Sequence, residues 1–331
     1  MAKRYQGGYV TANPPMPSST AATGVWTLTQ QLQATAAGNW QLPPLPGDIG
    51  LFAGGYNAGA SNSNIIDYIT ISATGNATDF GDLTAGYVRL ASCSSSTRGL
   101  FGGGDGPTNV ISYVTITTLG NAASFGQLTS ARTGLAGCSS STRGLFGGGG
   151  SSNVIDYVTI ATTGNATDFG DLTAAREYVG ACSSSTRGLF GGGTIGLVSN
   201  VIDYVTIATT GNATDFGDLT VARQRLAGCS SSTRGLFGGG FTTVVVNVID
   251  YVTIATTGNA TDFGDLTVAR QYISACSSST RGVFGGGNDG NNVNIIDYVT
   301  IGTTGNATDF GDLTLGRNGL AACSNAHGGL A

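Results

Sequence analysis

Two sets of charged side chains recur along the sequence and have the chemistry of acids, bases or anion-binding groups. Aspartates stand at one place in a repeated VIDYVT segment, and arginines stand at one place in a repeated SSSTRG segment. The aspartates are Asp67, Asp156, Asp203, Asp250 and Asp297, and the arginines are Arg98, Arg143, Arg187, Arg234 and Arg281. Catalysis needs one asymmetric group of side chains with unlike roles, whereas these are equivalent copies. We therefore interpret both sets as structural and predict that the chain is not an enzyme.

The second copy of the repeat lacks its acidic residues. Ser112 replaces the VIDYVT aspartate, and Ser124 and Gln127 replace the two acids on either side of the FG pair. In the third copy these three acids are Asp156, Asp168 and Asp171. Because all three are lost together, we expect them to fix the packing of the repeats jointly. Neutralising them should lower the melting temperature.

Each copy also contains one cysteine, whereas the whole chain has a single histidine, His327. The cysteines are Cys93, Cys138, Cys182, Cys229, Cys276 and Cys323. A disulfide needs Cα atoms closer than about 7 Å, which equivalent elements of a radial array would rarely offer, so we expect buried free thiols. Neither C-x-x-C nor D-x-D-x-D-G spacing occurs, and one histidine cannot serve a repeated site. We predict no metal, no cofactor and no catalytic residue.

The cysteines recur every 44 to 47 residues, an interval typical of propellers and solenoids. In the copy that begins at Leu236, strands are expected over residues 236–240, 248–255, 263–267 and 272–278, separated by Gly- and Asn-rich turns. Helical periodicity is missing. The third strand is apolar on both faces, which suits a sheet enclosed between two neighbouring sheets. The sequence thus predicts an all-β propeller built of radially packed, four-stranded antiparallel blades.

The two ends of the array predict how the propeller closes. The first copy begins with its second strand, over residues 49–55, and the last copy ends just after a first strand, over residues 320–325. The C-terminal strand should therefore join the N-terminal blade, which gives six blades and no free edge between the first and the last. We assign residues 47–331 to the propeller and residues 1–46 to an N-terminal extension.

Residue types within the repeat resemble those of kelch-type β-propellers. Two glycines close the second strand, as at Gly54 and Gly55. A tyrosine lies in each third strand: Tyr68, Tyr113, Tyr157, Tyr204, Tyr251 and Tyr298. Where kelch repeats usually have tryptophan in the fourth strand, this chain has phenylalanine: Phe80, Phe125, Phe169, Phe216, Phe263 and Phe310. The resemblance covers about 280 residues and implies the same blade architecture.

The six copies differ from one another mainly in two of their four connections. SSSTRG and TGNATD turns are each kept in five copies, whereas the second-to-third-strand loops and the loops from the fourth strand to the next copy vary. Antiparallel strands alternate in direction, so both variable connections emerge on one face. Variable loops on a constant frame are typical of a recognition surface, with neutral drift after duplication as the alternative. The candidate interaction residues are Tyr87, Arg89, Glu177, Tyr178, Gln224, Arg225, Gln271, Tyr272, Phe241, Val244 and Val245.

One of these loops, FTTVVV over residues 241–246, is hydrophobic. In a surface loop its three valines would be exposed to water unless another molecule covered them. We therefore expect a protein contact at this loop, such as a contact with another subunit.

Residues 1–46 differ in composition from the repeats and contain both tryptophans and six of the seven prolines. A short helix is expected over residues 27–37, ended by Gly38. The stretch GVWTLTQQLQATAAGNWQLP resembles N-terminal regions of virion structural and tail proteins of tailed phages, especially marine ones. That resemblance implies an anchor to other virion proteins, with packing of the helix on its own propeller as the alternative. The candidate anchor residues are Trp26, Leu28, Leu32 and Trp40.

Composition and charge narrow the choice of partners. Only 10% of the residues are charged, the net charge is −5 and Lys3 is the single lysine, so we expect no nucleic-acid binding. The sequence has neither a signal-peptide segment nor an apolar run long enough to span a membrane, which predicts a protein made in the host cytoplasm without membrane insertion. We predict a virion protein of the tail or fibre that contacts a host receptor or glycan. The alternatives are a capsid decoration protein and a lectin-like propeller.

Overall fold

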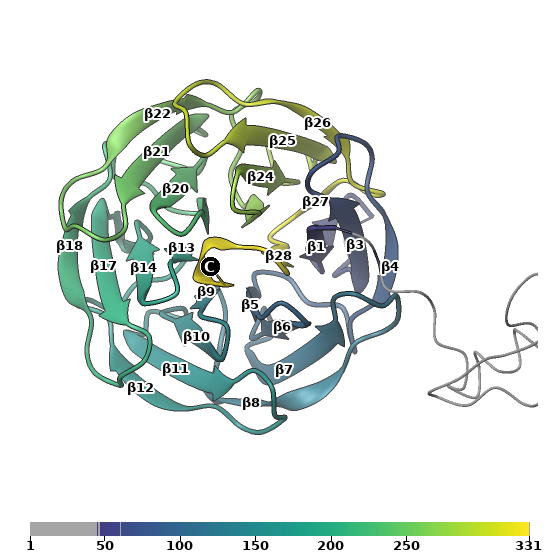
Figure 1. Cartoon of the computed structure of the whole chain (residues 1–331), viewed down its shortest axis with the longest axis horizontal. Helices are drawn as coiled ribbons and strands as arrows, with labels where there is room; N and C mark the ends of the chain where they lie inside the picture. Colours follow the sequence, from purple (N-terminus) through teal and green to yellow (C-terminus); the bar gives the residue numbers. More distant parts are fainter. Residues whose placement is uncertain (1–44, 46, 60, 331) are drawn as a thin grey trace, which may run out of the picture. The chain divides into compact units, whose positions relative to one another are not determined.

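The repeated segments form β-strands because their β-branched and aromatic residues pack well on a pleated surface. The computed structural model describes residues 45, 47–59 and 61–330. Four strands make each antiparallel sheet, and six such sheets stand around a central axis as the blades of a propeller (Figure 1). The predicted all-β, six-bladed architecture is therefore confirmed. In the described part of the chain, no helix is long and apolar enough to cross a membrane.

Within each blade the strands run in order from the axis to the rim. Blade 1 contains β28 (Ala321–Ser324), β1 (Ile49–Ala53), β3 (Ile65–Thr70) and β4 (Thr78–Asp82). Blade 2 contains β5 (Ala91–Ser94), β6 (Arg98–Gly102), β7 (Thr108–Thr115) and β8 (Ala123–Arg132). Blade 3 contains β9 (Ala136–Ser139), β10 (Arg143–Gly147), β11 (Val154–Thr159) and β12 (Thr167–Asp171).

The remaining blades repeat this order. Blade 4 contains β13 (Gly180–Ser183), β14 (Arg187–Gly191), β17 (Val201–Thr206) and β18 (Thr214–Asp218). Blade 5 contains β19 (Ala227–Ser230), β20 (Arg234–Gly238), β21 (Val248–Thr253) and β22 (Thr261–Asp265). Blade 6 contains β23 (Ser274–Ser277), β24 (Arg281–Gly285), β25 (Ile295–Thr300) and β26 (Thr308–Asp312).

The ring closes in blade 1, where the C-terminal strand β28 lies beside the N-terminal strand β1. The two strands are antiparallel, with Leu51 opposite Cys323. Beyond the strand, the Ile49 amide donates to Asn325 Oδ1 at 2.7 Å, and the Asn325 amide donates to the Ile49 carbonyl at 3.1 Å. The predicted closure is therefore correct, and blade 1 draws its strands from both ends of the repeat array.

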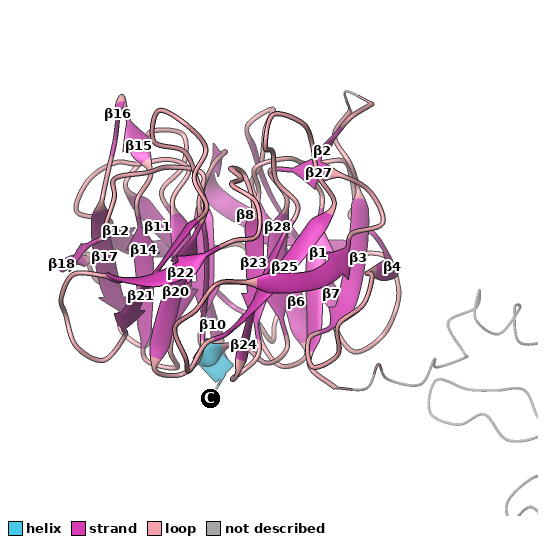
Figure 2. Ribbon diagram, turned by 90° about the horizontal axis from the view of Figure 1, so that it is seen from above, coloured by secondary structure: helices cyan, strands magenta, loops and turns pink. Residues whose placement is uncertain are grey.

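The two kinds of variable loop emerge on one face of the propeller, which we call the loop face; the opposite one is the turn face. In blade 1 the loop after the second strand contains β2 (Tyr56–Asn57), which pairs with β27 (Arg317–Asn318) in the loop that leads to β28. The corresponding loop of blade 4 forms a hairpin of β15 (Thr194–Ile195) and β16 (Leu197–Val198). Figure 2 shows these elements at the top and the 3₁₀ turn η1 (Gly328–Leu330) at the bottom.

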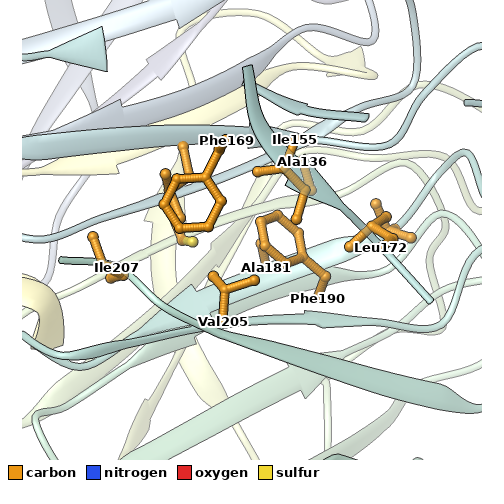
Figure 3. Close-up of a cluster of buried hydrophobic side chains, with 11 residues drawn as sticks. Ala136, Ile155, Phe169, Leu172, Ala181, Phe190, Val205 and Ile207 are labelled. Atoms are coloured by element: carbon orange, nitrogen blue, oxygen red, sulfur yellow. The ribbon is translucent and has the colours of Figure 1, made fainter. Parts of the chain in front are cut away.

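The hydrophobic core lies between neighbouring blades rather than within one of them. Between blades 3 and 4, Phe169 and Ile155 pack with Phe190 and Val205 of the next blade, and all four are at most 3% exposed (Figure 3). A Cβ atom on Gly147 would lie 2.7 Å from the Phe190 ring, so the glycine lets the blades approach closely. Tight packing of this kind explains why the repeat has changed so little along its strands.

The six cysteines are buried free thiols, as predicted. Each sulfur packs against a glycine of the second strand in the next blade: a Cβ atom on Gly188, for example, would lie 2.7 Å from Cys138 Sγ. Burial raises the pKa of Cys138 to about 12. A thiol that stays protonated is a poor nucleophile, so these cysteines act as small apolar side chains.

Strand boundaries differ from the expected ones by up to two residues. The strand expected over 236–240 is β20, Arg234–Gly238, because Gly239 and Gly240 take φ values of 63° and 113° and leave the sheet. The Gly240 amide donates instead to the Arg270 carbonyl. A β-bulge between Ile249 and Asp250 shifts the next pairing, so that the rim strand begins at Thr261 rather than at residue 263.

Contacts between blades account for the constancy of the turn face. Asn212 Oδ1, in a TGNATD turn, accepts a hydrogen bond of 3.1 Å from the Asp171 amide of the preceding blade. The Arg143 guanidinium lies 4.5 Å from the Tyr157 ring centroid and donates to the Ile207 carbonyl of the next blade. These turns are thus held by packing, so the contrast in variability between the faces does not by itself identify a recognition surface.

The predicted N-terminal helix and the candidate anchor residues Trp26, Leu28, Leu32 and Trp40 lie outside the described residues. The extension, its boundary at residue 46 and the anchor stay predictions.

Candidate functional site

Five of the repeated aspartates form buried ion pairs with arginines that the sequence analysis did not single out. Each pair joins a third-strand aspartate to an arginine of the preceding blade, which lies at the end of the fourth strand (Arg132 in β8) or in the connection that follows it. The pairs are Arg132–Asp156, Arg176–Asp203, Arg223–Asp250, Arg270–Asp297 and Arg317–Asp67. The side chains are at most 3% exposed, and the N–O distances are 2.5 to 2.8 Å. This arrangement supports the structural interpretation of the aspartates.

The Arg176–Asp203 pair shows how these buried charges are compensated, although Arg176 Nε has no hydrogen-bond partner. Asp203 accepts hydrogen bonds from the Thr173 amide and hydroxyl as well as from Arg176 Nη2. Arg176 Nη1 donates to the carbonyls of Gly192 and Val201. Burial opposes charge at these positions: it lowers the pKa of Arg270 and raises the pKa of Asp297, although each partner works against that shift.

The seam between blades 1 and 2 has lost both members of the pair. Tyr87 stands in the place of the arginine, and Ser112 stands in the place of the aspartate. The Ser112 hydroxyl shares a 2.8 Å hydrogen bond with Thr84 Oγ1. Because one partner alone would leave a buried charge without compensation, the joint replacement supports the view that the pairs act as units.

The structure separates the three acids that were expected to act together. Asp156 belongs to the buried pair with Arg132, but Asp168 is exposed and Asp171 is half-buried. Within the described chain, neither Asp168 nor Asp171 forms an ion pair. The expected joint effect on blade packing therefore reduces to Asp156.

On the turn face, the axial channel ends in a ring of serines and is filled by the C-terminal segment. Each serine hydroxyl donates to the carbonyl of the equivalent serine in the preceding blade, at 2.6 to 2.8 Å. The serines are Ser94, Ser139, Ser183, Ser230, Ser277 and Ser324. His327 lines a cavity of about 50 Å³ at this ring.

The contacts of His327 define its tautomer. Nε2 lies 3.1 Å from the Ser94 carbonyl, which can only accept, so Nε2 carries the proton. Nδ1 accepts from the Gly329 amide at 3.1 Å. Part of the side chain remains accessible, but burial of the ring lowers the pKa of His327 to about 4.

We expect the propeller to lose stability as the pH falls from about 6.5 to about 4. In that window the unfolded chain takes up a proton on His327, whose ordinary pKa is about 6.5, while the folded chain does not. The expected loss is on the order of 1 to 3 kcal/mol. Urea unfolding at pH 7 and pH 4.5 should show a smaller difference for His327→Gln than for the wild type, and an equal difference would contradict the assignment.

On the loop face, six equivalent residues close a ring of backbone hydrogen bonds around the axis. They are Arg89, Gly134, Tyr178, Arg225, Tyr272 and Gly319. Each amide donates to the carbonyl of the equivalent residue in the preceding blade, at 2.6 to 3.0 Å. All six have φ between 54° and 68°, which favours glycine. Arginine and tyrosine cost about 1 kcal/mol or more each in this conformation, yet they occupy four of the six positions.

The four larger side chains of this ring, Arg89, Tyr178, Arg225 and Tyr272, form what we call the axial cluster. The two tyrosine rings meet edge to face, with 5.6 Å between their centroids. The guanidinium carbon of Arg225 lies 4.5 and 5.5 Å from the two ring centroids, and that of Arg89 lies 5.1 and 5.6 Å from them. Beneath the cluster lies a cavity of about 100 Å³.

Charge in the axial cluster is only partly compensated. Arg89 Nη1 makes a 3.0 Å ion pair with Asp105, which also accepts from Thr133. Arg225 Nη1 donates to Gln271 Oε1 at 2.8 Å, and no described carboxylate pairs with Arg225. Burial works against charge on Arg89, but its two tyrosine neighbours and Asp105 outweigh this and raise its pKa.

The axial cluster gathers some of the predicted loop residues and leaves others apart. All of the predicted loop residues lie in the part of the chain that the structure describes. Gln271 touches Arg225 through its amide oxygen, and the Phe241 ring lies 5.3 Å from the Arg225 guanidinium carbon. Tyr87, Glu177, Gln224, Val244 and Val245 do not line the cavity beneath the cluster.

The expected exposure of three valines in the 241–246 loop is wrong for two of them. Val244 is 62% exposed, but Val245 and Val246 are half-buried. A bridge between Phe241 and Val245 folds the loop back on itself. On the neighbouring hairpin, Leu197 is more exposed than Val244, at 84%, and Ile195 is 56% exposed. The sequence analysis did not single out these two residues.

Other residues of the site were also missed. Asp105 lies in the blade 2 loop, and no feature of that loop indicates a partnership with Arg89. Gly134 and Gly319 did carry a signal, because they align with Arg89 and Tyr178 in the repeat and show that the position suits glycine. Among the described residues, no three His, Cys, Asp or Glu side chains come together as a metal site.

The fold and this site define the protein as a six-bladed β-propeller with an arginine–tyrosine cluster on its axis. No protein-family model matches the chain, and no curated protein matches it either.

Proposed function

We propose that this chain is a non-enzymatic virion structural protein of a tailed phage. Its kelch-like propeller is displayed on the particle, associated with the tail or fibre, and residues 1–46 anchor it to other virion proteins. The loop face contacts a host receptor. The observation that carries this proposal is the axial cluster, in which four bulky side chains occupy backbone positions that favour glycine.

Strain of this kind supports a role in recognition. Gly134 and Gly319 make the same backbone hydrogen bonds at the same φ without a side chain, so closure of the ring does not require arginine or tyrosine. Residues that are held in an unfavourable conformation although the fold does not need them cluster at functional sites. The resemblance of the N-terminal stretch to phage virion proteins supports the location on a particle.

A contact with a neighbouring subunit is the second candidate role of the loop face. Leu197 and Ile195 on the blade 4 hairpin and Val244 in the adjacent blade 5 loop expose apolar surface that a protein partner would cover. A capsid decoration protein would use such a contact without a receptor. A lectin-like propeller would instead use the axial cluster for a glycan.

Two measurements test the proposal. Mass spectrometry and immunogold labelling of purified particles should place the chain at the tail. Fluorescent full-length protein should bind the bacterial cells that the particle infects, and a variant with glycine at all four axial positions should bind at least tenfold less. Stoichiometric labelling over the whole capsid without cell binding would refute the receptor role and favour decoration.

A further inference from the structure

The axial cluster differs from the other arginine sites of the described chain because two guanidinium groups lie over the same two tyrosine rings, whereas a turn-face arginine such as Arg143 lies over one. Each arginine of the five buried ion pairs has a carboxylate partner: Arg176, for example, makes three side-chain hydrogen bonds, one of them to a carboxylate, although its Nε has no partner. Among the described residues, Arg89 and Arg225 each make a single side-chain hydrogen bond. Both guanidinium groups are held over the same two tyrosine rings. Their Nε atoms are buried without a partner, so the unpaired Nη N–H groups are the donors left for another acceptor.

The positions of the two arginines favour an oxyanion. Their faces are covered by tyrosine rings, which leaves the planar edges as the groups that can donate hydrogen bonds. A guanidinium edge matches the two oxygens of a carboxylate or sulfate group. Asp105 compensates Arg89, whereas Arg225 has only the neutral oxygen of Gln271. Glu177 adjoins Tyr178 but forms no ion pair with either arginine in the described chain.

A chain of amide side chains begins with Gln271 beside Arg225 and continues over the loops of blade 6. Gln271 accepts from Arg225, and its backbone forms a bridge with Asn288. Asn288 and Asn318 both donate to the side-chain oxygen of Asn292. Amides that can both donate and accept are suited to the hydroxyl groups of sugars. Two aromatic rings, two guanidinium groups and the Gln271 amide thus lie together at the axis on the loop face.

We infer that the axial cluster binds an acidic saccharide unit, with its carboxylate or sulfate group on Arg225 and Arg89 and its hydroxyl groups on the neighbouring amides. This inference rests on the proposed function, because it names the ligand class of the same loop face. Gly134 and Gly319 flank Arg89 in the backbone ring, and the Tyr178 ring and the Val88 side chain lie where a Cβ atom at these glycines would be.

The test uses the full-length protein and defined small probes, with binding measured by titration calorimetry and by ligand-observed NMR. The probes are methyl glucuronide, glucose 6-sulfate, methyl glucoside, sodium sulfate and a glutamate-rich peptide. At least one acidic sugar should bind about tenfold or more tightly than methyl glucoside, because a charge-assisted contact is lost with the neutral sugar.

The matched variant is Arg225→Gly, which copies what the chain already has at residues 134 and 319. It should weaken binding of the acidic sugar about tenfold to a hundredfold while leaving the melting temperature unchanged or higher, since glycine relieves the positive φ. Arg225→Lys keeps the charge and should restore part of the affinity. Arg143→Gln removes an equal charge from the turn face and should not change binding.

Several results would overturn the inference. The first is equal binding of acidic and neutral sugars, and the second is wild-type affinity in Arg225→Gly. The third is no binding of methyl glucuronide or glucose 6-sulfate at 10 mM, because a dissociation constant of about 10 mM is roughly the weakest that is useful for a displayed site. Sulfate or the peptide binding as tightly as the sugar acids would also refute it. If the sugars fail but cells are still bound through the axial positions, the ligand class is wrong and the proposed function stands. If cell binding fails too, both are wrong.

Discussion

Replacing Asp203 with serine is expected to lower the free energy of unfolding by about 3 to 5 kcal/mol. The change leaves the Arg176 guanidinium at a buried seam without its carboxylate, and an uncompensated buried charge is among the most costly defects in a protein. For a propeller of this size, the melting temperature should fall by roughly 6 to 20 °C. Urea and thermal unfolding followed by circular dichroism measure both quantities.

The molecule itself supplies the compensating change. At the seam between blades 1 and 2, Tyr87 and Ser112 occupy the positions of Arg176 and Asp203. The double variant Arg176→Tyr with Asp203→Ser should therefore be more stable than the sum of the two single changes predicts, by about 1 to 3 kcal/mol.

An additive double variant would contradict the interpretation of the pairs as units. Asp168→Asn is the matched control, because this acid lies in the same repeat but is exposed, and it should change stability by less than about 0.5 kcal/mol.

Comparison of the six copies with one another predicted the blades, the closure of the ring and the buried thiols, because these features depend on the repeat. The spacing of the cysteines indicated the blades, and the missing first strand before Ile49 indicated the closure with β28. Both follow from counting elements, since every strand in a closed ring needs a partner. Buried free thiols also followed, because each cysteine holds the same place in its copy and equivalent elements of a radial array rarely come close enough for a disulfide.

The ion pairs were missed because they join residues of different copies. Asp203 and Arg176 lie 27 positions apart in neighbouring repeats, and their contact depends on the angle at which the two blades pack. A signal was nevertheless present: Tyr87 in the first copy and Ser112 in the second depart from the pattern of the other copies, and they occupy the two partner positions of one seam. Comparing each blade with its neighbour, rather than with the average copy, would have found it.

The sequence predicted the four residues of the axial cluster as candidate interaction residues, but it did not predict that they lie together on the axis. Arg89, Tyr178, Arg225 and Tyr272 were selected because their loops vary, yet variation alone says nothing about distance to the axis. Their positive φ values could not be predicted from the sequence, because arginine and tyrosine normally avoid this conformation. Comparison of the copies could not predict the role of His327, because this residue follows the last strand and has no equivalent in another copy.

Removing the closing strand is expected to have the largest effect of any change considered. A chain that ends at Gly319 loses β28, so β1 keeps only β3 as a neighbour and presents an unpaired edge to the axis. The same deletion removes Leu320 and Cys323 from the buried interior, together with the Ser324 hydroxyl that completes the serine ring. We expect loss of cooperative unfolding and aggregation at 37 °C, seen by calorimetry and gel filtration.

A chain that ends at Asn325 provides the control that separates closure from the tail. It keeps β28 and the paired contacts between Asn325 and Ile49, and it lacks residues 326–331, which include His327 and the turn η1. Its melting temperature should fall by a few degrees at most at pH 7, and its acid sensitivity should decrease. Because the Gly319 chain still contains every other strand, a peptide of residues 320–331 added in trans should restore cooperative unfolding by pairing with β1. Cooperative unfolding of the Gly319 chain without that peptide would show that five complete blades hold the ring and that β28 contributes little.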